Sequence, residues 1–241
     1  VNDYDASVDP ARRAAAYQAW WEHQPTRVPA PGSAGFDIYR SLDAGELCRI
    51  TVLDTRQYSD ATTLLGTDQQ TWLDQQLDHD RTWTVLASPV LISGLLIPID
   101  DEVLLPYTWD GYPSERAWLA DQLAEKQNRI CVSGDLHSSS ALTVRADPSR
   151  RSLPVVGTEF LAPAISSQFP QDVADLAPLL TLSNPHMEHF ETANGWLLLD
   201  ITADQTTAEF RFVDDITDPD SSITSSLRYE VSSGDPNPQR V

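Results

Sequence analysis

Short apolar runs bounded by polar or turn residues are the main pattern along this chain. The runs at 47–53, 83–88 and 129–133 are rich in Val, Ile and Leu and have the length of buried strands. Between them, apolar residues recur at helical spacing, as at Trp72, Leu73 and Leu77. The order strand, helix, strand, helix, strand predicts βαβ-type units, in which ligands bind outside the carboxyl ends of the strands.

Capping signals give the helix boundaries. Asp9 followed by Pro10 is a typical helix start, and Ala-rich sequence continues the predicted helix to about His23. A second helix is expected to open at 66–70, with Thr67 or Asp68 as its cap. A third is expected over 114–127, and a further strand over 37–40.

Beyond His137 the pattern becomes β-rich. Strands are expected at 141–145, 155–160, 196–201 and 207–213, and the last alternates cleanly, which favours a sheet with one face in water. The tail from Ser232 is rich in Gly, Pro, Asp and Asn and is expected to be loosely ordered. We therefore predict that residues 1–231 are the C-terminal portion of a single α/β domain with α+β character, followed by a tail over 232–241.

The charge narrows the range of partners. With 36 acidic and 16 Lys and Arg residues, the formal net charge is -20, which argues against a nucleic-acid backbone or an anionic membrane as partner. No apolar stretch approaches the roughly 20 residues that span a bilayer. An anionic substrate would therefore need a local positive charge, such as a metal ion. Cys48 and Cys131 lie in apolar runs and are expected to be buried thiols, with a disulfide as the alternative.

The stretch 133–137, Ser-Gly-Asp-Leu-His, is the strongest candidate for chemistry. It directly follows a predicted buried strand, and in extended backbone Asp135 and His137 would point to the same side, where both could bind one metal ion. The alternative is a polar turn without function. Asp54 and Ser88 also follow predicted strands, so three stretches are expected to meet in one site.

Histidines supply a second signal. The loop 184–189, Asn-Pro-His-Met-Glu-His, contains His186 and His189. Imidazole and carboxylate donors together suit first-row divalent or ferric ions. His23 and His79 lie beside charged residues on predicted helices and are interpreted as surface or packing residues.

Seven motifs follow one another along the chain. They are LDTRQY (53–58), LLGTDQQTWL (64–73), WDGYP (109–113), SGDLHSS (133–139), GTEFLAPAISS (157–167), NPHMEHFE (184–191) and FVDDITDPDSSI (212–223). Each motif is weak alone, but in this order they resemble the PhoD family of alkaline phosphatases and phosphodiesterases. The likeness spans nearly the whole chain.

The resemblance implies a metallophosphoesterase-type double β-sheet flanked by helices. It also implies metal ions, usually iron with calcium although other divalent ions are alternatives, and an exported protein, extracellular, periplasmic or on the cell surface. The family's GDVH and NPH motifs carry metal-site roles over to Asp135, His137 and His186. Asn2 and Asp3 match the last two positions of its HEVxN[ND] motif, and Asp3 stands where many members have Asn. Several of the family's metal-binding acids precede this region, so we expect that the N-terminal part of the fold is missing here and that an upstream chain or segment completes the site.

These signals favour hydrolysis of a phosphate ester by a metal-activated water, with Asp135 and His137 at the metal and Arg56 as a phosphate clamp. For Arg56 the alternative is pairing with an acid such as Asp54. Other candidate roles remain open. They are pocket lining or a packed turn for Asp110 and Tyr112, a covalent nucleophile among Ser138, Ser139 and Ser140, and a metal ligand or a hydrogen-bond partner for Glu159. A non-catalytic fragment or binding domain, and a metallohydrolase acting on carboxylic esters, are the rival functions.

Overall fold

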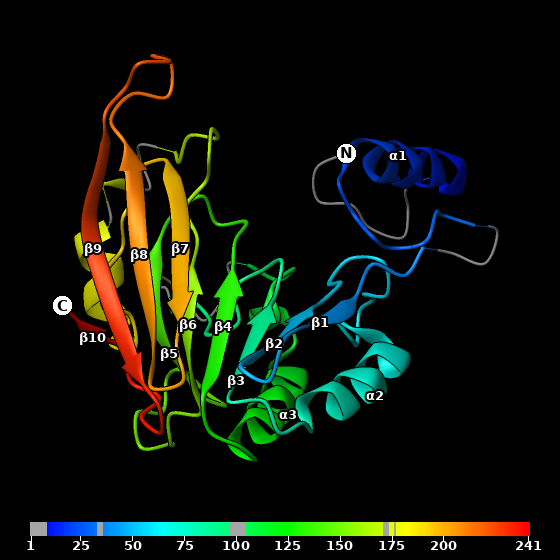
Figure 1. Cartoon of the computed structure of the whole chain (residues 1–241), viewed down its shortest axis with the longest axis horizontal. Coiled ribbons are helices and arrows are strands. Elements are labelled where there is room, and N and C mark those ends of the chain that lie inside the picture. Colours follow the sequence, from blue (N-terminus) through cyan, green and yellow to red (C-terminus); the bar gives the residue numbers. More distant parts are fainter. Residues whose placement is uncertain (1–8, 33–35, 97–104, 171–173, 176) are drawn as a thin grey trace.

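Two β-sheets form the centre of the computed structural model, which describes residues 9–32, 36–96, 105–170, 174–175 and 177–241 (Figure 1). Strands β2, β3, β4 and β6 of the first sheet are parallel, and β1 and β5 run antiparallel at its edges. The order of this six-stranded sheet is β1 (Arg40–Ala44), β2 (Cys48–Val52), β3 (Trp83–Ala87), β4 (Arg129–Ser133), β6 (Gly157–Leu161) and β5 (Ser140–Val144).

The second sheet is antiparallel and built entirely from the C-terminal part of the chain. Its order is β10 (Gln239–Arg240), β9 (Ile223–Ser232), β8 (Gln205–Val213) and β7 (Gly195–Ile201). Residues of β8 alternate between buried and half-buried positions along much of the strand, which confirms the alternation seen in the sequence.

Two of the described helices cover the face of the first sheet that points away from the second sheet. The described helices are α1 (Pro10–His23), α2 (Gly66–Leu77), the 3₁₀ turn η1 (Trp109–Gly111), α3 (Pro113–Ala124) and α5 (Ala177–Ser183). Helices α2 and α3 lie together along the face opposite the second sheet (Figure 1). No helix in the described ranges is long and apolar enough to cross a membrane.

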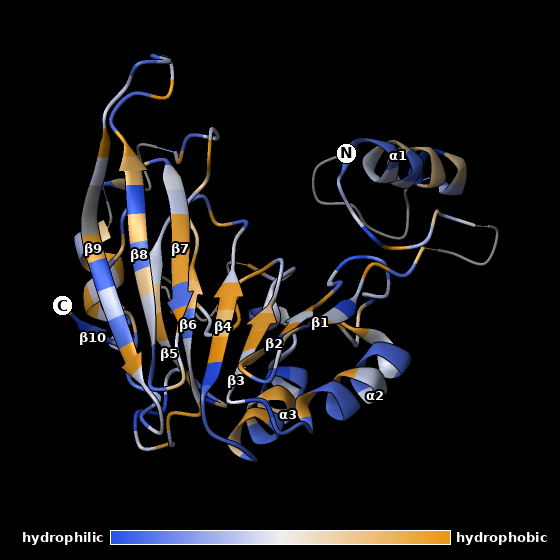
Figure 2. Ribbon diagram, in the orientation of Figure 1, coloured by the Kyte–Doolittle hydropathy of each residue, from blue (hydrophilic) through white to orange (hydrophobic). Residues whose placement is uncertain are grey.

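The interior strands separate two cores, one on each face of the first sheet. Leu86 and Cys131 point towards α2 and α3, where they pack with Leu73 and Leu119. On the other face Trp83, Ile130 and Phe160 pack against residues of the second sheet. Figure 2 shows β3 and β4 as almost continuously apolar, as expected for strands covered on both faces.

Helix starts show where local signals succeed and fail. Asp9 caps α1 as predicted, because its carboxylate accepts the Ala11 N–H at 3.3 Å. Neither Thr67 nor Asp68 caps α2, and that prediction is wrong: the helix begins at Gly66, and no side chain caps it from the Leu65 position. The N–H groups of Leu64 and Leu65 instead bond the carboxylate of buried Glu115, at 2.6 and 3.0 Å. Only folding brings that partner from α3.

Three further elements differ from the expectations. The strand expected over 37–40 begins only at Arg40 and continues to Ala44, because a hairpin pairs it with β2. Neither β9 nor α5 was predicted. The expectation of a loosely ordered tail is wrong, since β10 pairs with β9 and the Thr158 hydroxyl donates to the Pro236 carbonyl at 2.6 Å.

Candidate functional site

The carboxyl ends of the parallel strands lie side by side at one edge of the first sheet. Just beyond these ends, the Leu53 N–H bonds Ala87 O at 2.9 Å, and the Ser88 N–H bonds Val132 O at 2.9 Å. The polar stretches that follow β2, β3 and β4 therefore begin side by side at the same edge of the sheet, as the βαβ pattern predicts.

Of the three residues that follow strands, Asp54 and Ser88 are buried and form hydrogen bonds within the loops. Asp54 is 2% exposed and accepts the backbone N–H groups of Arg56 and Gln57, at 2.9 and 3.0 Å. Ser88 is also buried, donates to Val90 O at 2.6 Å and accepts the Trp109 indole N–H at 3.2 Å. Both residues fix the loop conformation and are shielded from solvent.

Asp135 and His137 are the exposed members of this edge. Both have left-handed backbone, with φ of 72° and 55°, a conformation that side chains other than Gly rarely adopt. The expectation that Asp135 and His137 lie in extended backbone is therefore wrong, because the stretch forms a tight loop. Strained backbone of this kind is common where a loop presents functional side chains. Here it presents a carboxylate and an imidazole to solvent.

Arg56 comes from the neighbouring loop and faces Asp135. Its Nη2 lies 3.9 Å from Asp135 Oδ2, and the two side chains are 25% and 40% exposed. The guanidinium also lies over the ring of Tyr107, 5.4 Å from the centroid. Sequence reasoning missed Tyr107, which lies two residues before the start of the WDGYP motif, in a stretch interpreted as irregular. This edge of the sheet thus combines a cation, an anion and an imidazole in partly hydrated surroundings.

The serines after His137 do not offer an exposed hydroxyl. Ser138, Ser139 and Ser140 are fully buried. Ser140 Oγ donates to His189 O at 2.6 Å, and Ser139 Oγ lies 3.5 Å from His189 Nε2. These hydroxyls hold the loop 184–191 against β5, so their contacts favour a structural role over a nucleophilic one.

The structure places His186 in the interior of the fold. His186 is 3% exposed; its carbonyl accepts the Thr143 N–H, and its Nε2 lies 3.1 Å from Gly94 O. Thr143 is three residues along β5 from Ser140, which pairs with the carboxyl end of β6, so the His186 backbone sits about 10 Å from that edge. Burial lowers the pKa of His186, and its Nδ1 has no hydrogen-bond partner among the described residues. Its role at a metal remains a prediction.

His189 lies between the two sheets. Its ring stacks on Tyr229, with centroids 5.4 Å apart, and its Nδ1 lies 3.0 Å from the Tyr229 hydroxyl. Burial lowers the pKa of His189 to about 4, so the ring is neutral at pH 7.

The other polar candidates form hydrogen bonds with the backbone of neighbouring loops. Glu159 is fully buried and accepts the N–H groups of Ile92 and Ser93, at 2.9 and 2.7 Å, which makes it a hydrogen-bond partner of the loop after β3. Asp110 accepts the Leu95 N–H at 2.9 Å and pairs with Arg116. The Tyr112 hydroxyl donates to Asp60 O at 2.8 Å. These contacts describe WDGYP as a packed turn.

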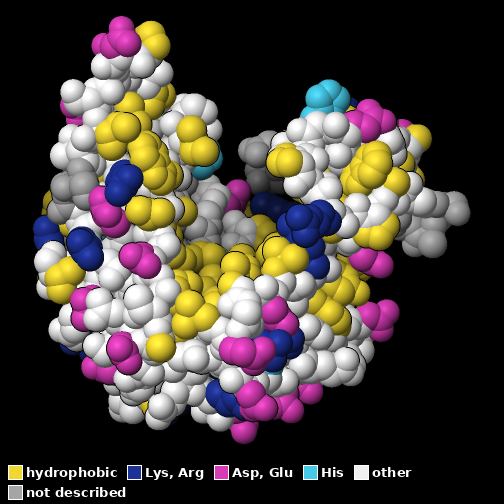
Figure 3. All heavy atoms as spheres, viewed as in Figure 1, with side chains coloured by type: hydrophobic (Ala, Val, Ile, Leu, Met, Phe, Trp, Pro, Cys, Tyr) yellow, Lys and Arg dark blue, Asp and Glu magenta, His cyan; other side chains and the backbone are white. Residues whose placement is uncertain are grey.

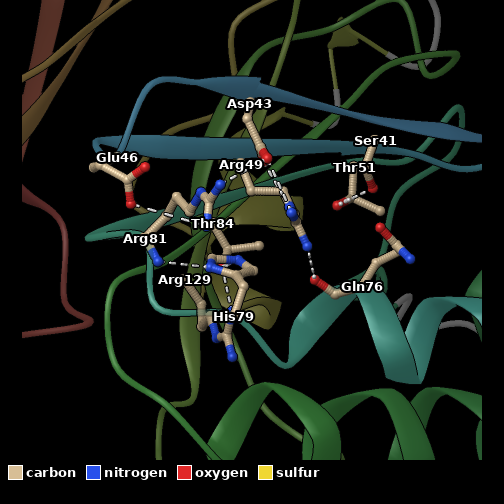
Figure 4. Close-up of polar contacts among 10 residues, drawn as sticks. All are labelled: Ser41, Asp43, Glu46, Arg49, Thr51, Gln76, His79, Arg81, Thr84 and Arg129. Carbon is tan, nitrogen blue, oxygen red and sulfur yellow. Dashed lines mark hydrogen bonds and ion pairs between the residues drawn. The ribbon is translucent and has the colours of Figure 1, made fainter.

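A basic cluster lies at the opposite, amino edge of the sheet (Figure 4). Arg49 and Arg81 both pair with Asp43, at 2.7 and 3.0 Å, and Arg129 donates to Thr84. His79 bonds within this cluster, which confirms it as a packing residue, and burial together with the nearby cations lowers its pKa to about 4.

The described residues do not by themselves form a complete metal centre. No group of three or more His, Cys, Asp and Glu side chains in these ranges is arranged to hold an ion. Asp135 and His137 are two exposed donors on one loop, whereas three or more protein ligands are usual for a transition-metal site. Asn2 and Asp3, the other predicted ligands, lie outside the described residues. Cys48 and Cys131 are buried free thiols, as expected.

Comparison with known proteins places this arrangement in context. A family model described as PhoD-like phosphatase matches residues 2–210. Alkaline phosphatase D of Bacillus subtilis (strain 168) is 30% identical over an alignment of 243 residues. The alignment covers 90% of this chain and 42% of that protein. A solved structure of PhoD has a TM-score of 0.84 and 26% identity, over 95% of this chain and 49% of the other. The chain thus spans about half the length of the relatives that it matches.

Proposed function

Because this chain belongs to the PhoD-like phosphatase family and has its metallophosphoesterase-type fold, we propose that it contributes half of a phosphoester hydrolase active site. The observation that carries the proposal is the position of Arg56 beside the Asp135–His137 loop, at the carboxyl edge of the parallel sheet. A phosphate ester is an anion, and on a chain of net charge -20 it needs such a local cation to bind.

Arg56 is the proposed phosphate clamp. A guanidinium presents its N–H donors as a planar fork that matches two phosphoryl oxygens, and stacking on Tyr107 restricts its orientation. Its Nη2 lies 3.9 Å from Asp135 Oδ2, about 1 Å beyond the usual N–H···O distance, so this ion pair is not a tight hydrogen bond.

Asp135 and His137 are the proposed metal-binding residues. Their exposed carboxylate and imidazole suit iron, with calcium or another divalent ion as the second metal that the family resemblance implies. A metal pair would supply Lewis-acid polarisation of the phosphoryl group and an activated water. Two donors do not complete such a centre, so the remaining ligands are proposed to come from Asn2 or Asp3, His186 and an upstream polypeptide segment.

Export is part of the proposal. Members of the PhoD family are usually exported, and the strongly acidic composition of this chain agrees with such a location. The family resemblance alone supports it.

The rival functions are separable by experiment. The purified chain, alone and co-expressed with an upstream segment, is assayed for bound metal and for hydrolysis of bis-p-nitrophenyl phosphate. We expect turnover and metal only when the segment is present. Absence of both turnover and metal from both preparations would identify a non-catalytic domain. Turnover of p-nitrophenyl acetate that is insensitive to phosphate would identify a carboxylic ester hydrolase.

A further inference from the structure

Glu159 is a buried acid that the proposed mechanism does not use. Figure 3 shows Asp and Glu side chains at many places on the surface, in contact with water, whereas Glu159 of β6 is 0% exposed. No cationic side chain in the described ranges forms an ion pair with it. A buried carboxyl group is costly unless hydrogen bonds replace those it made to water. The groups that bond Glu159 therefore indicate what it does.

The two oxygens of Glu159 bind consecutive backbone N–H groups of one loop. The Ile92 N–H donates to Oε1 at 2.9 Å, and the Ser93 N–H donates to Oε2 at 2.7 Å. Burial raises the pKa of Glu159, and the hydroxyls of Ser133 and Ser93 act with these N–H groups in the opposite direction. The two N–H donors are 67 and 66 residues away in sequence, so the contact forms only in the folded chain.

This loop crosses one strand of the first sheet. We call residues 88–95 the β3 loop, because they follow β3. It starts at Ser88, whose N–H bonds β4, and it is bonded further along to Glu159 of β6, on the far side of β4. Ile92 packs in the same core as Cys131, so the β3 loop crosses β4 on the side of the helices. Glu159 thus fixes the β3 loop across β4.

The loop that presents Asp135 and His137 leaves β4 beside the β3 loop. A Cβ built on Gly134 would lie 3.9 Å from Pro89 O, an ordinary van der Waals contact, so the two backbones lie close together there. Asp135 and His137 have left-handed backbone, which persists only where the surrounding structure holds it. The β3 loop is one part of that surrounding structure.

The β3 loop also contacts His186, the other proposed metal ligand among the described residues. Gly94 O lies 3.1 Å from His186 Nε2, and the next residue, Leu95, donates its N–H to Asp110 at 2.9 Å. The same segment therefore lies against both places from which metal ligands are proposed to come, and Glu159 holds it between them.

We infer that Glu159 is a positioning residue for the proposed active site. It touches neither substrate nor metal. By fixing the β3 loop, it sets where the Asp135–His137 loop stands relative to His186. The inference rests on the proposed function, in which these side chains bind metal ions. Displacing groups of an active site by about 1 Å can lower the rate about a hundredfold, so a residue of this kind affects turnover from a distance.

Glu159→Gln tests the inference, and Glu115→Gln is its matched control. Glu115 also accepts two consecutive backbone N–H groups, but from Leu64 and Leu65 instead of the β3 loop. Gln keeps one acceptor oxygen and turns an NH₂ group towards the other N–H, so each variant leaves one buried amide without an acceptor. The two variants should therefore lose similar stability in urea, and circular dichroism establishes that both are folded.

Amide hydrogen exchange and steady-state hydrolysis are measured on the chain complemented by its upstream segment. In Glu159→Gln we expect exchange over 88–95 and 134–137 to quicken at least about tenfold, and kcat for a phosphodiester to fall about 10–100-fold. KM should change less than about threefold, because Arg56 is untouched. Glu115→Gln should alter kcat less than about twofold and leave exchange over 134–137 as in wild type.

Glu159→Asp keeps the charge and is one methylene shorter, so it should give smaller changes of the same kind, and it replaces Glu159→Gln if that variant does not fold. Unchanged exchange over 134–137 in the folded Glu159 variants, or an equal loss of kcat in both Gln variants, would overturn the inference. A wild-type preparation without turnover counts against the proposed function alone, since exchange over 134–137 still decides whether Glu159 positions the loop.

Discussion

Arg56 shows how one side chain can acquire a role from its surroundings. The sequence places it after a strand beside Asp54, and both a clamp and an ion pair with Asp54 fit that pattern. In the structure Asp54 is engaged by backbone N–H groups, and the Arg56 guanidinium lies between Asp135 and Tyr107. The clamp interpretation gains support because the head group is partly exposed at the edge where ligands bind.

Replacing Arg56 should reduce hydrolysis strongly. In the chain complemented by its upstream segment, Arg56→Ala should lower kcat/KM for a phosphodiester by about 10²–10³-fold, as expected for the loss of one preorganised donor. Arg56→Lys should fall between, since it keeps the charge and loses the fork. Arg211→Ala is the control because Arg211 pairs with Glu209 on β8. Equal activity of Arg56→Ala and wild type would exclude the clamp.

Asp135 and His137 can be tested by metal content. Asn tolerates the left-handed backbone found at both positions, so Asp135→Asn and His137→Asn should fold normally. Each should lower the metal-to-protein ratio of the complemented enzyme by at least half, measured by inductively coupled plasma mass spectrometry. Asp200→Asn, at an exposed position of β7, should retain the full ratio. Unchanged metal in both loop variants would remove them from the metal centre.

At the scale of elements, long-range polar contacts hold helices and sheets together. Glu115 of α3 binds the backbone that leads into α2, and His189 joins the loop beside β5 to β9 through Tyr229. Neither contact involves neighbours in sequence. Both polar groups are largely removed from water, so their loss should be costly.

Glu115→Ala should destabilise the fold by about 3 kcal/mol, because the buried N–H groups of Leu64 and Leu65 lose their acceptor. Asp121→Ala changes an exposed acid on the same helix and should alter the free energy of unfolding by less than about 0.5 kcal/mol. Urea unfolding followed by tryptophan fluorescence measures both. Equal midpoints for the two variants would contradict a bridging role.

His189 should make stability depend on pH. Its pKa is about 4 in the folded chain and about 6.5 when unfolded, so the unfolded state binds more protons between these values. The free energy of unfolding should therefore fall as pH drops from about 6.5 to about 4, by up to about 3 kcal/mol from this residue. His79 and His186 act in the same direction.

His189→Phe keeps a ring beside Tyr229 and removes the titration. The variant should have a shallower pH dependence than wild type in chemical unfolding between pH 4 and 6.5. Parallel pH profiles for wild type and His189→Phe would show that the imidazole does not titrate in this window.

At the scale of the whole molecule, charge is the dominant property. Thirty-six acidic side chains against 16 basic ones repel one another in the compact state, and four of the basic side chains gather at the amino edge of the first sheet, namely Arg49, Arg81, Lys126 and Arg129. Because the field of the whole chain is negative and repels anions, binding of an anion at the carboxyl edge depends on a local cation such as Arg56.

Salt should stabilise the chain. Raising sodium chloride from 0.02 M to 0.5 M shortens the Debye length from about 20 Å to about 4 Å and screens the repulsion, so the Tm should rise by several degrees. Differential scanning calorimetry at pH 7.5 measures it, with equimolar sucrose as a control for general solute effects. A falling Tm would indicate that the paired charges outweigh the repulsion.

Much of the layered architecture could be predicted from the sequence. The length and β-branched content of 83–88 and 129–133 determine buried strands, helical spacing determines α2 and α3, and Asp9 with Pro10 determines where α1 begins. These features depend on residues that are only a few positions apart in sequence, so they can be read without knowing the tertiary structure. The same local pattern placed Asp54, Ser88 and Asp135 at one sheet edge, because parallel strands align their carboxyl ends.

Only the tertiary structure decided which of those residues is available for chemistry. Asp54 and Ser88 are buried, and they form hydrogen bonds with Gln57 and Trp109. Asp135 and His137 are exposed on a loop in which both have left-handed backbone. Tyr107, from a separate stretch of the chain, packs its ring against the Arg56 guanidinium. The sequence likewise contained no sign that Leu42, Ile50 and Val132 would be partly exposed on one face of the first sheet, because their exposure depends on where the second sheet ends. Burial and the approach of distant segments are properties of the packed chain, since they arise from residues that are close in space and far apart in sequence.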